Sequence, residues 1–84
     1  MSLVSKNVVV KSKNGIHFRN AGALAELANN CDHKVSISFS DKHVDAGKAL
    51  EVILLGAKYG SQVTIQVSGE APETVFSKVK SILS

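Results

Sequence analysis

A histidine and an arginine lie two positions apart where a glycine-containing loop leads into a predicted helix, in the segment Asn14-Gly15-Ile16-His17-Phe18-Arg19-Asn20-Ala21. The first N–H groups of a helix have no partner inside it, and its dipole gives that end partial positive charge. A phosphate on His17 would therefore meet backbone donors, and the Arg19 guanidinium could add a charge-assisted bond. The same field favours a neutral imidazole, whose free lone pair can attack phosphorus.

The spacing of His17 and Arg19 alone is also compatible with a solvated surface that has no phosphate site, because histidines before helices and arginines in first helical turns are common. The other two histidines, His33 and His43, lack metal-ligand spacing with His17. We expect both on solvated positions, one in a turn and one at a strand edge. No metal site is predicted.

The other reactive side chains are weaker candidates for a functional site. The single cysteine, Cys31, has no neighbour in sequence that would activate its thiol, so we expect a small packed side chain. Glu26, Asp45 and Glu51 cannot be paired as acid and base from their positions, and charged solvated faces are their ordinary explanation. Five of the six glycines fall one per loop and show no P-loop arrangement: Gly15, Gly47, Gly56, Gly60 and Gly69.

Length and composition favour one small globular domain. The 84 residues are 44% hydrophobic but only 5% aromatic, so Val, Ile, Leu and Ala must build the core. The formal net charge is +3, but the lysines are scattered, which argues against a nucleic-acid-binding surface. Neither a signal-peptide pattern nor a membrane-spanning run is visible, so we expect a cytoplasmic protein without membrane insertion.

Hydrophobic periodicity predicts the order β-α-β-β-α-β-α. Alternating apolar residues indicate strands at 4–11, 34–40 and 62–68, with a short return strand at 43–44. Helical spacing indicates helices at 18–30 and from Pro72 onward. Residues 49–55 fit either a buried strand or a helix, and we favour a short helix ending at Gly56. Strands with one solvated face and helices with one apolar stripe imply an antiparallel sheet covered on one face.

The segment around His17 resembles the active-site signature of the HPr family, the histidine-containing phosphocarriers of the bacterial sugar phosphotransferase system, Asn-Gly-Leu-His-x-Arg-Pro-Ala. The similarity continues through the helical stretch ending Leu55-Gly56, the strand from Gly60 and the Gly69-Glu70 turn. It implies an α+β open-faced β-sandwich over residues 1–84, with a four-stranded antiparallel sheet covered on one face by three helices.

The resemblance also implies residue roles. His17 would accept the phosphoryl group through Nδ1, with Arg19 beside it. The predicted phosphate-binding residues are Phe18, Arg19 and Asn20, and the predicted site loop contains Ser12, Asn14 and Gly15. A partner-binding surface would comprise Phe18, Lys48, Ala49, Leu50, Ile53 and Gly56.

The implied activity is that of a phosphoryl carrier rather than a free-standing enzyme. Enzyme I would be the donor, IIA domains of sugar permeases would be the acceptors, and regulatory proteins are further possible partners. Such a shuttle needs no cofactor, and we expect a monomer.

Two residues depart from the family pattern. Asn20 occupies the position of the signature proline, so we expect a less rigid helix start and slower transfer or a different partner. Lys48 falls where Gram-positive members have a regulatory serine, so no serine switch is predicted there. Both departures keep open an alternative: a divergent paralogue that acts as a regulatory protein-binding module.

Overall fold

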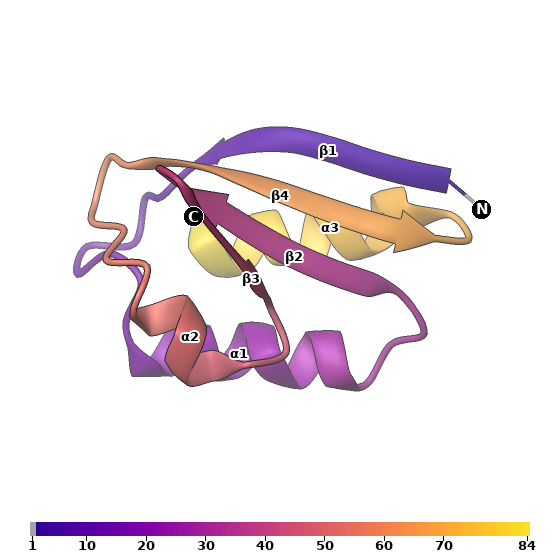
Figure 1. Ribbon diagram of the computed structural model, residues 1–84, viewed down its shortest axis with the longest axis horizontal. Coiled ribbons are helices and arrows are strands. Elements are labelled where there is room, and N and C mark those ends of the chain that lie inside the picture. Colours follow the sequence, from indigo (N-terminus) through magenta and orange to yellow (C-terminus); the bar gives the residue numbers. More distant parts are fainter. Residues whose placement is uncertain (1) are drawn as a thin grey trace.

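A computed structural model describes residues 2–84 and shows four strands and three helices (Figure 1). In chain order these are β1 (Ser2–Val9), α1 (Phe18–Asn29), β2 (Lys34–Phe39), β3 (Lys42–Asp45), α2 (Ala49–Ile53), β4 (Gln62–Gly69) and α3 (Pro72–Leu83). The predicted order β-α-β-β-α-β-α is confirmed. No helix in this part of the chain is long and apolar enough to cross a membrane.

The strands form one sheet in the order β1-β4-β2-β3, and all neighbouring pairs are antiparallel. The register places apolar residues opposite one another, as in Val8 with Val63 and Ile37 with Ile65. All three helices lie on one face of the sheet, α3 behind β1 and β4 and α2 against α1 (Figure 1). The predicted open-faced architecture is confirmed.

The core lies between the sheet and the helices and consists of aliphatic side chains. Its largest fully buried members include Leu24 of α1, Ile37 of β2, Ile65 of β4 and Leu83 of α3. Each comes from a different element, so burial of this apolar surface joins both layers. Because three strands and two long helices meet in this core, it fixes the position of α1 and of the loop that precedes it.

The opposite face of the sheet carries polar side chains that bond across the strands. Thr64 donates through Oγ1 to Asn7 Oδ1 at 2.8 Å, and the Ser38 hydroxyl lies 2.6 Å from His43 Nδ1. This pattern explains why the strands alternate in sequence, since one face contacts water and the other contacts helices.

Two boundaries differ from the predictions. The first strand is paired over Ser2–Val9 rather than 4–11, because the chain leaves the sheet after Val9. The Lys11 N–H then donates to the Leu83 carbonyl at 2.9 Å, which holds the start of the loop against the end of α3. The second helix covers only Ala49–Ile53, and tighter turns continue it to Gly56.

His33 lies in the predicted turn before β2, but its side chain is not fully solvated as expected. The ring is half-buried, and Nε2 donates to the backbone carbonyl of Glu70 in the turn between β4 and α3. Its Nδ1 is buried without a hydrogen-bond partner. The side chain therefore connects two loops at one end of the sheet, an arrangement that links residues 37 positions apart and leaves no local pattern.

Candidate functional site

The loop before α1 is held by backbone hydrogen bonds on both of its sides. The Gly15 N–H donates to the Ser12 carbonyl at 2.9 Å and closes a tight turn. The next residue, Ile16, donates to the Ala57 carbonyl at 3.0 Å, which attaches the loop to the segment between α2 and β4. The Ile16 side chain is buried in the core. His17 thus follows directly after an anchored residue.

His17 is the N-cap residue of α1, with an extended backbone. The first intrahelical bond runs from the Ala21 N–H to the His17 carbonyl at 2.9 Å. The N–H groups of the three residues before Ala21 therefore have no carbonyl partner one turn earlier in the helix.

The Arg19 N–H donates to His17 Nδ1 at 3.4 Å. An accepting Nδ1 carries a lone pair, so the ring proton of the neutral side chain is on Nε2. The unprotonated ring nitrogen of His17 thus faces the positive end of the helix.

The side chain of His17 is accessible from solvent, and the start of α1 places no acidic side chain next to it. The imidazole is half-buried, whereas Arg19 is exposed and the first turn of α1 contains no acidic residue. Phe18 is 80% exposed, and its ring meets the His17 ring edge-on with centroids 5.9 Å apart. An anion brought by a partner can therefore approach the ring and the helix donors together.

Asn20 was predicted to bind phosphate and, in place of a proline, to leave the helix start less rigid, but its side chain is used within the loop and helix end instead. Its side chain is buried, with Oδ1 accepting from the His17 N–H at 2.8 Å and Nδ2 donating to the Gly15 carbonyl at 3.0 Å. Both polar groups of the side chain are therefore engaged within the chain and are not available to an anion. The hydrogen bonds constrain the helix start in place of a proline ring.

The three residues predicted to form the site loop differ in their burial and in their backbone contacts. Ser12 is half-buried and contributes its carbonyl to the turn, and Gly15 lies buried against the loop after α2. Asn14 is exposed at the tip of the turn. The sequence-predicted set from Ser12 to Asn20 therefore gathers in one loop and one helix end.

Comparison with known proteins identifies the family. A family model described as the PTS HPr component phosphorylation site matches residues 4–84, nearly the whole chain. This chain belongs to the HPr family. It is thus a member of the phosphocarrier proteins of the phosphotransferase system, as the signature around His17 predicted.

Individual HPr proteins are similar over most of their length but at low identity. The HPr of Cupriavidus necator is 26% identical over 82 residues, which cover 98% of this chain and 92% of the relative. The HPr of Chlamydia muridarum is 25% identical over 76 residues, covering 90% of this chain and 73% of the relative. A crystal structure of HPr from Bacillus anthracis superposes with a TM-score of 0.91 at 26% identity, over the full length of both chains.

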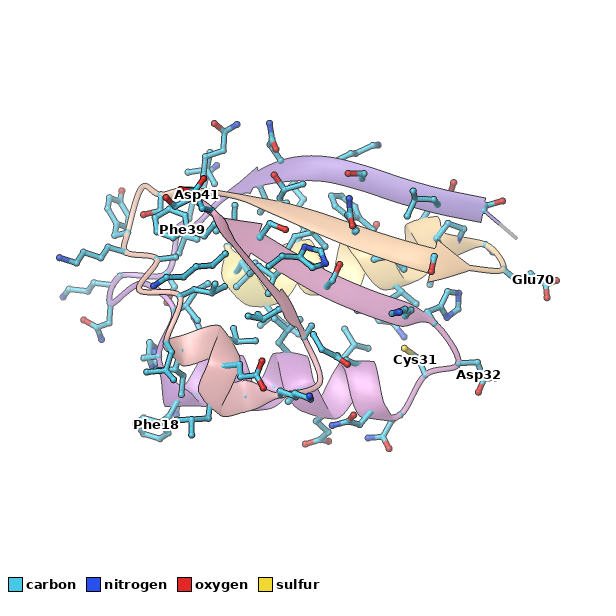
Figure 2. All side chains as sticks on the ribbon, viewed as in Figure 1. Phe18, Cys31, Asp32, Phe39, Asp41 and Glu70 are labelled. Atoms are coloured by element: carbon cyan, nitrogen blue, oxygen red, sulfur yellow. The ribbon has the colours of Figure 1, made fainter. Side chains whose placement is uncertain are left out.

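Apolar side chains are exposed at the start of α1 and on α2, two helices that pack against each other. Phe18 begins α1, and Figure 2 shows its ring at the end of the molecule where α2 packs against α1. Leu50 of α2 is 69% exposed, whereas Ala49 and Ile53 are only half-buried and pack against the core. Gly56 is exposed just after α2. The predicted partner-binding residues therefore lie on and next to the short helix α2, except Phe18, which begins α1.

Leu54 was missed among the candidate surface residues, although it is 65% exposed. It lies four positions after Leu50, so both leucines occupy the same side of the α2 segment. That spacing was visible in the sequence, but five of the six residues at 50–55 are apolar, interrupted only by Glu51, and this concealed which side faces the core.

Lys48 is the exposed N-cap residue of α2 and makes no side-chain capping bond. Its Nζ lies 3.8 Å from the Glu51 carboxylate, an exposed pair that contributes little to stability. The lysine therefore places a positive charge at the border of the apolar surface.

The remaining candidates lie in other surroundings. Cys31 packs against the core, and its Sγ lies 3.6 Å from the Ala28 carbonyl, as expected of a packed thiol. Figure 2 places Cys31 near Asp32 and Glu70, at the opposite end of the molecule from Phe18. His43 is exposed on edge strand β3, as predicted. Within residues 2–84, no three His, Cys, Asp or Glu side chains gather as metal ligands would.

Proposed function

We propose that this HPr-family chain carries a phosphoryl group on Nδ1 of His17 between two proteins. The observation that supports this role best is the contact between the Arg19 N–H and His17 Nδ1, at 3.4 Å. It aims the unprotonated ring nitrogen at the helix end whose donors would stabilise the transferred group.

The transfer needs only one bond exchange at phosphorus. The Nδ1 lone pair attacks the phosphorus of a phosphohistidine on the donor as the bond from phosphorus to the donor's nitrogen breaks. The proton on His17 Nε2 stays in place, and the departing donor ring takes back its electron pair. Once Nδ1 is phosphorylated, the Arg19 N–H that faced the lone pair can donate to a phosphate oxygen instead.

The partners we propose are enzyme I as donor and IIA domains of sugar permeases as acceptors. Their phosphorylated or accepting histidine must come within bonding distance of Nδ1, so each partner must cover the surface beside it. The exposed side chains of Phe18, Leu50 and Leu54 offer apolar area for such short-lived complexes. We propose that the carrier acts as a monomer, since transfer needs one free His17 per partner.

The direct test is incubation of the purified protein with enzyme I and phosphoenolpyruvate, followed by intact mass measurement. We expect the mass of one phosphate to be added, and the modification to be labile in acid and stable in base. An unmodified protein, together with recovery of a non-permease partner in a pull-down, would favour the regulatory binding module instead.

Arg19→Gln is expected to slow phosphoryl transfer by about 10- to 100-fold, because it removes one charge-assisted hydrogen bond to the phosphate. Arg19→Lys keeps the charge without the two-pronged geometry and should lie between Arg19→Gln and the unmodified sequence. Quenched-flow measurement of phosphate incorporation gives the rates.

Lys78→Gln, on the exposed surface of α3, is the matched control for net charge. It should leave the transfer rate unchanged. Equal slowing by Lys78→Gln and Arg19→Gln would show that overall charge, and not a contact with the phosphate, sets the rate.

A further inference from the structure

Asn20 has an unusual environment for a polar side chain in this fold. Only 7% of its surface is exposed, and it is the one buried polar residue in residues 2–84. Burial of an amide is costly unless its donor and acceptor both find partners. Here both do, and the two partners belong to the loop that carries His17.

The two hydrogen bonds of Asn20 hold both ends of a three-residue segment. Nδ2 donates to the carbonyl of Gly15 at 3.0 Å, and Oδ1 accepts from the N–H of His17 at 2.8 Å. Ile16 between them is fixed separately through the Ala57 carbonyl. The backbone on the N-terminal side of His17 is thus constrained at three consecutive residues.

This constraint bears on the direction of the imidazole. The side chain of His17 reaches the Arg19 N–H with Nδ1 only while its backbone keeps the extended N-cap conformation, with φ at −134° and ψ at −177°. Without the bond to Asn20, the His17 N–H would be a free donor and the cap could rotate. Proline at this position would fix a backbone angle but offers no side-chain donor or acceptor.

We propose, on the basis of the phosphocarrier function above, that Asn20 is a positioning residue. Its amide holds the His17 backbone so that Nδ1 faces the helix N-terminus, and it supplies by two hydrogen bonds the constraint that a proline would supply by its ring. Asn20 makes no contact with the phosphate through its side chain.

Asn20→Ala removes both bonds and should lower the catalytic rate of phosphorylation by about 10-fold, since small displacements of a reacting group reduce rates strongly. The KM for this protein as substrate of enzyme I should not change, because the exposed apolar surface is untouched. In ¹⁵N NMR spectra of the unphosphorylated protein, the His17 ring should change from one tautomer to a mixture. The His43 ring, bonded to Ser38, serves as reference in the same spectra.

Gly22→Ala separates positioning from helix stability. A Cβ at Gly22 meets open space, and alanine favours the helix, so the substitution strengthens α1 away from the loop. In the double variant Asn20→Ala with Gly22→Ala, the melting temperature should recover while the slow transfer and the mixed tautomer persist. Gly22→Ala alone should transfer phosphate at the unmodified rate.

Two results would overturn the role of Asn20. One is an unchanged His17 tautomer and rate in Asn20→Ala, and the other is recovery of the rate together with the melting temperature in the double variant. Failure of the phosphocarrier function would differ from both, because the unmodified chain would then accept no phosphate while the tautomer measurement still reports on Asn20.

Discussion

Replacing His17 with asparagine is expected to abolish phosphate incorporation while the fold stays intact. Asparagine is a favourable N-cap residue, so the variant keeps a side-chain acceptor at the start of α1 but lacks a nucleophilic ring nitrogen. His17 is only half-buried and contributes nothing to the fully buried core. Intact mass after incubation with enzyme I and phosphoenolpyruvate should show no added phosphate, and the circular dichroism spectrum should be unchanged.

His43→Asn is the matched control, because His43 is exposed on β3 and lies outside the loop and helix end described above. It should incorporate one phosphate at the normal rate. Phosphate on the His17→Asn protein would place the acceptor at another residue and contradict the proposed site.

Gly15→Ala is expected to lower the free energy of unfolding by about 3 kcal/mol, the sum of a strained backbone and a steric clash. The Gly15 φ is +71°, and an added Cβ would lie 2.7 Å from both the Ala57 carbonyl oxygen and Lys58 Cα. Both contacts are backbone atoms, which cannot rotate away. The loop must shift, and His17 with it, so phosphoryl transfer should also slow.

Gly56→Ala provides a control with the same backbone angle. Its φ is +75°, but the added Cβ meets no atom within 4 Å. The cost should therefore be the left-handed conformation alone, about 1–2 kcal/mol. Urea denaturation of both variants measures the difference. Equal destabilisation would show that the contact between the His17 loop and the Ala57 segment does not restrict the backbone.

Much of this fold was accessible from the sequence, because its strands alternate and its long helices carry one apolar stripe. Val63, Ile65 and Val67 face the core as their spacing predicted. The short helix α2 was harder, since five apolar residues in a six-residue stretch fit a strand equally well and hide the exposed positions of Leu50 and Leu54.

The candidate site was predicted from the position of His17 and Arg19 relative to a helix start, together with the resemblance of residues 14–21 to the HPr signature, and both are local features. The role of Asn20 was not predicted, because the partners of an amide depend on which way the side chain points. Its bonds to Gly15 and His17 require the loop to turn back on the helix, and a sequence pattern does not contain that geometry. The same applies to His33, whose partner Glu70 is distant in the chain.

The position of the phosphate on the His17 ring tests the account most directly. In the ¹⁵N-labelled protein phosphorylated through enzyme I, one-bond coupling between phosphorus and a ring nitrogen identifies the bonded atom by NMR. We predict coupling to Nδ1 of His17, the nitrogen that faces the Arg19 N–H. Coupling to Nε2, or to a nitrogen of His33 or His43, would contradict it.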